Sequence, residues 1–348
     1  MKPVESLLNE PVSVPVPDAQ KTPVEIIATL KTINPSLKNP RSLRLMMHEL
    51  ESLVEAGPAA LPAIRDFLNG RQDIEYTDAF AKGFKDGQIS ADFTLPPSLR
   101  LGLLEAVKNI GGADAEATLA DIFSTSSSGA EIAYVTQALD SMAPGKYRDV
   151  ALAAARDLLI NPGADNGSQS RLDKFQSAYL YQGVISRYKD ASFTALAQSQ
   201  LVQADGGINT NALDYLQQTM GDQSLAIVAQ ASQDPRVTPS KAEPLARAAL
   251  NYVGADPQAD TVYQNFINNP NLPADQRKNL IEDLNDQGFA NSDKPTDQEF
   301  AMIQKRIDLL QKLAPSAMDQ VNANAFQEAY KDLINMRDRA TGSPVPSK

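Results

Sequence analysis

Cysteine and histidine, on which much nucleophilic, general-base and zinc chemistry depends, are almost absent from this chain. There is no Cys, and His48 is the only histidine, so thiolate chemistry and zinc sites built on sulfur are excluded. A Ser-His-Asp relay would have to use His48, which lies one position beyond the apolar stripe of its predicted helix and should face outward. No G-x-S-x-G motif accompanies it. These absences predict a protein without catalytic residues, and we therefore expect that it is not an enzyme.

Carboxylates are abundant, because the chain contains 43 Asp and Glu residues. Two of them held about 5 to 10 Å apart could hydrolyse a glycosidic bond, so an enzyme with a carboxylate-based site stays open as an alternative. Asp283 opens a segment that resembles a calcium-binding loop, but Lys294 stands at the twelfth place, where such loops need a bidentate Glu. Glycine-rich phosphate loops are absent. The sequence predicts no metal site and no cofactor.

The charge balance restricts the partners. The formal net charge is -11 at pH 7, so the surface field should repel phosphate backbones and anionic lipid headgroups. No run of residues approaches the roughly 18 apolar residues of a membrane span. We expect neither a nucleic-acid partner nor membrane insertion. The absence of Cys beside many Asn, Gln, Asp, Ser and Ala residues is typical of an exported (periplasmic or cell-envelope) protein whose signal or anchor is absent from this sequence; a cytoplasmic location is the alternative.

An internal repeat indicates how the chain is built. The tetrapeptide at 42–45 recurs at 98–101, and the apolar stripe recurs with it. Steps of four, three and four residues put each set on one face of a helix. A third copy of the stripe follows 32 residues later. The three stripes are Leu43, Met47, Leu50 and Val54; Leu99, Leu103, Ala106 and Ile110; and Val135, Ala138, Leu139 and Met142.

Glycines and capping boxes mark where these helices end and begin. The first two stripes stop at Gly57 and Gly111, residues suited to the left-handed end of a helix. Ser128 with Glu131 predicts the start of the third helix, and Thr296 with Glu299 predicts a long helix through Leu313. Breakers between 160 and 288 keep a spacing near 32 residues, which fits two short helices per unit.

These features resemble HEAT repeats, in particular the bacterial kind grouped with phycobilisome-lyase-like repeats. The likeness rests on an early Arg in the first helix (Arg44, Arg100), the helix end at 107–112 and the second helix at 59–64. The resemblance implies an all-α fold, an α-solenoid in which about seven to eight antiparallel helix hairpins stack into a right-handed superhelix. The phycobilin lyases that share this repeat attach chromophores, and nothing in this sequence carries that activity over.

The expected organisation has five parts. A Pro- and Val-rich disordered tail covers 1–24, and hairpins follow over 25–160. Divergent hairpins continue over 161–292, a capping hairpin covers 293–340, and a second disordered tail covers 341–348.

An insertion at 71–97 separates the first two copies and carries the only aromatic cluster expected to lie apart from the repeats. Insertions in a repeat array emerge on one edge, often the binding edge. The alternative is that its aromatic rings fold back as a lid on the core. The second helices of the repeat hairpins carry two arginines, which we expect to form one binding surface with the insertion. The predicted partner-binding residues are Arg65, Tyr76, Phe80, Phe84, Phe93 and Arg156.

Stacked hairpins present a long concave face that suits an extended segment. We therefore expect a non-enzymatic scaffold that holds a protein or peptide partner. The alternatives are the carboxylate enzyme, with its site near the insertion, and a structural component of the cell envelope.

Overall fold

A computed structural model describes residues 21–70, 72–76, 84–85, 88–162, 171–285, 296–316 and 320–340. It is all-helical apart from one two-stranded antiparallel sheet among these residues, which confirms the predicted all-α class. The chain divides into two compact units between Val184 and Ile185, a boundary that the repeat spacing did not predict. None of the described helices is both long enough and apolar enough to cross a membrane.

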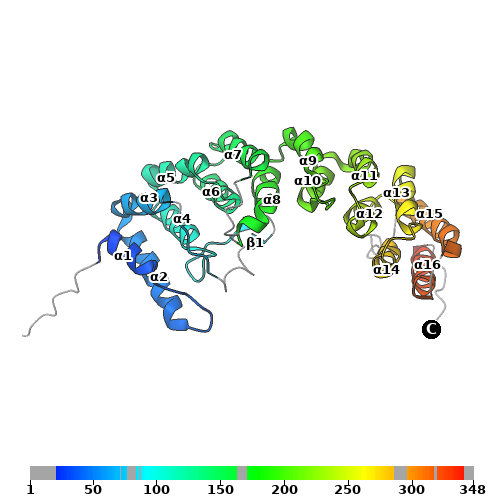
Figure 1. The fold of residues 1–348 in the computed structure, drawn as a ribbon, viewed down its shortest axis with the longest axis horizontal. Helices are drawn as coiled ribbons and strands as arrows, with labels where there is room; N and C mark the ends of the chain where they lie inside the picture. Colours follow the sequence, from blue (N-terminus) through cyan, green and yellow to red (C-terminus); the bar gives the residue numbers. More distant parts are fainter. Residues whose placement is uncertain are drawn as a thin grey trace, which may run out of the picture. The chain divides into compact units, whose positions relative to one another are not determined.

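The first unit contains the helices that the repeat predicted (Figure 1). Its helices are α1 (Pro23–Leu30), α2 (Pro40–Glu55), α3 (Leu61–Asn69), α4 (Leu99–Ile110), α5 (Gly112–Thr125), α6 (Gly129–Met142), α7 (Arg148–Ile160) and the short α8 (Gln176–Ala178). Strands β1 (Phe84–Lys85) and β2 (Gln88–Ile89) lie in the insertion. Helices α2, α4 and α6 pack against one another in sequence and form one row, and α3, α5 and α7 form a second row in the same way. The two rows are joined within hairpins, since α4 packs on α5 and α6 packs on α7.

The second unit repeats this pattern of contacts. It contains α9 (Thr194–Gln200), α10 (Thr210–Met220), α11 (Ser224–Ser232), α12 (Glu243–Leu250), α13 (Pro257–Ile267), α14 (Ala274–Glu282), α15 (Asp297–Leu313) and α16 (Gln320–Ala340). Helix α10 contacts α12 as well as α11, and α11 contacts α13 as well as α12. The predicted capping box of Thr296 and Glu299 opens α15, which ends at Leu313 as expected.

The N-terminal boundary of the fold was predicted too late. Thr22 and Glu25 form a capping box, and Pro23 begins α1, whereas the tail was expected to reach residue 24. Lys21 also donates to the buried carboxylate of Glu49 on α2. The rest of the predicted tail, residues 1–20, lies outside the described residues.

Two predictions about helices α2 and α6 were wrong, and a long-range ion pair lies at each of these places. On α2 the buried residues are Met46, Glu49, Leu50 and Leu53, whereas the predicted stripe residues other than Leu50 are only half-buried. The buried face thus lies one position before the predicted stripe, and it includes Glu49, which pairs with Lys21. Ser128 stands at the start of α6, but its hydroxyl makes no capping bond. Glu131, expected to complete that capping box, pairs with Arg100 instead.

Candidate functional site

The predicted arginines lie on the row formed by α3, α5 and α7. Arg65 and Arg156 are both exposed. Arg65 donates from Nη2 to the hydroxyl of Thr118 on α5 over 2.7 Å. This bond links two successive second helices while leaving the guanidinium at the surface.

The described part of the insertion packs on the opposite row. Tyr76 is only 1% exposed, and its N–H donates to the carbonyl of Pro97 over 3.0 Å, which closes the insertion at its base. Phe93 is half-buried. Phe84 lies in β1, although its side chain and all of Phe80 fall outside the described residues. The buried ring of Tyr76 is what the lid alternative expects.

A glutamine on α6 holds the insertion in place. The Gln137 side-chain oxygen accepts the N–H of Ile89 over 3.3 Å, and its amide nitrogen donates to the carbonyl of Ile89 over 3.3 Å. Ile89 itself is buried, and β2 packs on α6. Since α6 belongs to the row of α2 and α4, the contacts described for the insertion lie on a different row from Arg65 and Arg156. The grouping of all six predicted residues stays a prediction, because Phe80 and the side chain of Phe84 fall outside the described residues.

Removing this amide should loosen the insertion. We expect Gln137→Ala to lower the free energy of unfolding by about 1–2 kcal/mol, because two neutral hydrogen bonds contribute roughly 1 kcal/mol each. Hydrogen exchange at the Ile89 amide should accelerate. Gln137→Glu keeps the acceptor and loses the donor at neutral pH, so its effect should be intermediate. Unchanged exchange at Ile89 in Gln137→Ala would show that other contacts hold the strand.

The carboxylates that lie beside the insertion are engaged in structural bonds. Arg100 donates to Glu131 and, over 2.6 Å, to the carbonyl of Leu68 at the end of α3. Burial raises the pKa of the Asp73 carboxyl and the nearby Glu131 charge adds to this rise, while N–H donors, including that of Arg100 at 3.0 Å, oppose it. This network ties α3, α4 and α6 together. Within the described part of the chain, no group of three or more His, Asp or Glu side chains could hold a metal ion.

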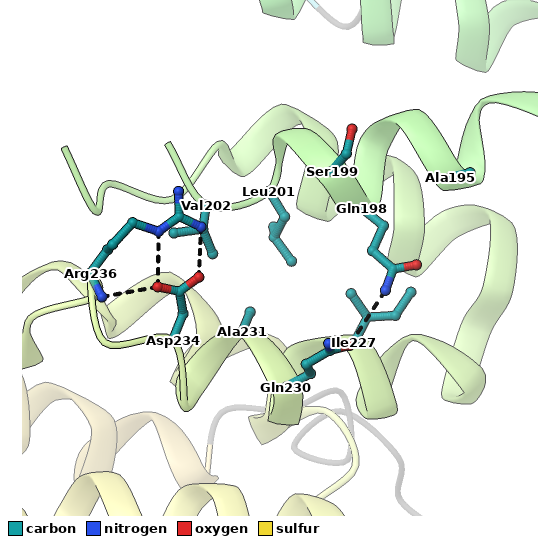
Figure 2. A pocket seen from close by; sticks show the side chains of 10 residues that line it. All are labelled: Ala195, Gln198, Ser199, Leu201, Val202, Ile227, Gln230, Ala231, Asp234 and Arg236. Carbon is teal, nitrogen blue, oxygen red and sulfur yellow. Dashed lines mark hydrogen bonds and ion pairs between the residues drawn. The ribbon is translucent and has the colours of Figure 1, made fainter. Parts of the chain in front are cut away.

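A groove in the second unit offers more suitable chemistry for binding. It lies between α9 and α11 and has a volume of about 390 Å³. In Figure 2, Leu201 and Ala231 face each other across its middle, Gln198 and Gln230 meet at one end, and Asp234 and Arg236 pair at the other. Its other lining residues are Ala195, Ser199, Val202 and Ile227.

Apolar side chains form the floor of the groove, because Leu201 is 1% exposed and Ala231 is 7% exposed. At the rim, Gln198 donates to the side-chain oxygen of Gln230 over a long distance of 3.5 Å. Both glutamines are exposed. A ligand can therefore displace this weak bond and use both amides as donors and acceptors.

The charged end of the groove is neutralised internally. Arg236 donates to Asp234 from Nε over 3.0 Å, from Nη2 over 2.6 Å and from its backbone N–H over 2.9 Å. These bonds lower the pKa of Asp234 to about 2. A carboxylate with so low a pKa stays ionised and is a poor general acid near neutral pH.

This pKa can be measured. In a carbon-13 NMR titration, the Asp234 carboxyl should titrate with a midpoint near 2. Because the folded-state pKa is depressed, the contribution of the pair to stability is complete above pH 3.8 and is lost as the pH falls toward 2. In Arg236→Gln the backbone bond remains, so the pKa should rise toward 3.8 without reaching it. Asp205, whose pKa is lowered by Gly207 and Lys241, is the control carboxyl and should not change. An Asp234 pKa that stays near 2 in the variant would contradict this assignment.

A second hollow lies between α15 and α16, with a volume of about 360 Å³. Leu310, Ala323 and Phe326 give it an apolar lining. Gln311 donates to the Tyr330 hydroxyl over 2.9 Å at its edge. It offers fewer polar groups for recognition than the groove between α9 and α11.

The sequence contained a signal for the groove that composition and motifs did not reveal. Gln198 and Gln230 are 32 residues apart, the same interval that separates the second and third copies of the repeat. Residues at equivalent places in successive units lie side by side along a row. A search for polar residues at this interval could have found the pair. No protein-family model, curated protein or solved structure matches the chain.

Proposed function

We propose that this protein is a non-enzymatic binding protein with the architecture of an α-solenoid of HEAT type, and that it holds a protein or peptide partner. Two features support the architecture. Within each unit, helices contact both their hairpin partner and the next helix of their own row, and the sequence repeat places equivalent apolar residues on α4 and α6. Such stacks present elongated surfaces built from successive units.

The groove between α9 and α11 is the observation that carries the binding function. It combines a buried apolar floor with amide groups that can both donate and accept hydrogen bonds, a combination typical of ligand sites. The ion pair of Asp234 and Arg236 leaves no unbalanced charge on its lining. A neutral polypeptide segment satisfies each of these features, since it offers amide groups and apolar side chains together.

A substitution that fills the groove, combined with a measurement of peptide affinity, tests the proposal. Peptides would be selected from a randomised phage-displayed library against the full chain, and their affinities measured by fluorescence polarisation. Ala231→Phe places a ring where Ala231 faces Leu201, so we expect the selected peptides to lose at least about tenfold in affinity, roughly 1.4 kcal/mol. Ala226→Phe is the matched control, because Ala226 is exposed on the same helix and does not line the groove.

Two results would overturn the proposal. One is a library from which no peptide is enriched. The other is equal affinity in Ala231→Phe and Ala226→Phe, which would move the binding surface away from this groove. Circular dichroism of both variants shows whether the helices survive the added ring.

A further inference from the structure

The main chain at Val202 is an open strand edge on the groove. Val202 and Ile208 form an isolated antiparallel bridge. On either side of this bridge, the N–H of Gln203 donates to the carbonyl of Gly207 over 2.8 Å, and the N–H of Asn209 donates to the carbonyl of Leu201 over 2.9 Å. In this pattern Val202 and Ile208 are a non-hydrogen-bonded pair, so the N–H and C=O of Val202 point away from Ile208.

These two main-chain groups have no partner among the residues that the structure describes. Val202 nevertheless lines the groove, beside Leu201 and at the end where Asp234 and Arg236 pair. Unpaired N–H and C=O groups at a strand edge are a template for another extended chain. Val202 therefore offers an unpaired main-chain N–H and C=O at a residue that also lines the groove, in addition to the two glutamine amides.

The first unit shows how this protein captures an extended segment. There, one glutamine side chain on a helix binds both main-chain groups of Ile89 at 3.3 Å, while the aliphatic side chain of Ile89 is buried. The groove contains the same components: glutamines on helices, and an apolar floor that includes Ile227 and Ala231. In the groove the extended segment is not supplied by the described part of the chain.

We infer that the groove binds an extended, uncharged polypeptide segment that adds to the Val202 edge as a strand and places an aliphatic side chain on the floor. This inference rests on the proposed function and specifies its ligand. Gln198 and Gln230 take main-chain groups of the segment, as Gln137 does for Ile89. Because an extended chain directs alternate residues to opposite sides, only every second residue of the ligand faces the Val202 edge.

The neutral lining predicts how binding responds to salt. The affinity for a selected peptide should change less than about twofold when the ionic strength rises from roughly 0.05 to 0.5 M. Salt screens net charges, and the Asp234–Arg236 pair on the groove has no net charge. A steep fall in affinity with salt would show that the ligand is recognised by its charge and would overturn the inference.

An N-methyl scan of a selected peptide tests the strand geometry. Methylation of one backbone nitrogen at a time removes that N–H. We expect a loss of about tenfold or more at the residue that pairs with Val202 and little effect at its two neighbours, whose N–H groups point to the other side. Uniform sensitivity would identify a helical ligand, and uniform tolerance would identify recognition by side chains alone. Either result overturns the inference while leaving the proposed binding function in place, whereas a library without binders removes both.

Substitution at Val202 provides the complementary test. Val202→Pro removes the N–H from the edge, and Val202→Ala removes most of the side chain while keeping the N–H. We expect the Pro variant to lose the peptide and the Ala variant to retain most of the affinity. Equal affinity in the two variants would contradict the strand addition. If Val202→Pro alters the circular dichroism spectrum, the N-methyl scan decides the question alone.

Discussion

Replacement of Arg306 by Met should lower the free energy of unfolding of the second unit by about 3–5 kcal/mol. Arg306 is fully buried, and its guanidinium donates to the carbonyls of Val253, Leu284 and Leu250 over 2.8, 2.6 and 2.9 Å. Leu250 is the last residue of α12, and Leu284 follows α14. The side chain thus joins the ends of two helices to α15. Met fills similar space but removes one donor from each of three buried carbonyls, although the Leu250 carbonyl still accepts the N–H of Val253 over 3.3 Å.

The positive charge suits this position because carbonyl ends of helices carry partial negative charge. Burial lowers the pKa of Arg306 to about 10, so the side chain remains protonated at neutral pH. Urea unfolding and hydrogen exchange of residues 243–285 would measure the loss, with amides of the first unit as an internal reference. Lys305→Met, on the same helix but exposed, should change stability by less than about 0.5 kcal/mol. Similar losses in the two variants would show that the contacts of Arg306 contribute little.

A methyl group at Gly206 should disrupt the turn that positions Val202. Gly206 has φ +80°, and a Cβ built there would lie 1.9 Å from the carbonyl oxygen of Arg236 and 2.7 Å from its carbonyl carbon. Both atoms belong to the backbone, so no side-chain rotation relieves the overlap. We expect Gly206→Ala to cost about 3 kcal/mol or more, because strain and overpacking add. The turn and the segment at 234–237 must separate, which opens one end of the groove.

Gly112 provides a control for the backbone strain alone. Its φ is +81°, and nothing lies within 4 Å of a Cβ built there. Gly112→Ala should therefore cost only about 1–2 kcal/mol. Urea unfolding gives both values, and exchange at the Gln203 and Asn209 amides reports on the turn. Equal costs at the two glycines would mean that Arg236 and its neighbours move without penalty. If Gly206→Ala still binds peptide with unchanged affinity, the groove does not depend on this turn.

Local sequence patterns predicted several of the helices and some of their ends. The stripe from Leu99 to Ile110 became α4, and the capping box at Thr296 opened α15, because both signals act between residues three or four positions apart. The spacing near 32 residues also separates Gln198 from Gln230, a pair that the sequence analysis did not identify. It did not indicate which of the residues that recur at this interval would line a groove.

Only the tertiary structure decided which competing partner each polar residue takes. Glu131 was predicted to form a capping box with Ser128, but it accepts hydrogen bonds from Arg100, 31 residues away, and from the hydroxyl of Ser126. Tyr76 was predicted to contact a partner and is buried at the base of the insertion. The open edge at Val202 depends on a turn whose close approach to Arg236 requires Gly206. Periodicity records which face of a helix is apolar, whereas these contacts depend on which surfaces folding brings together, and no local pattern contains that information.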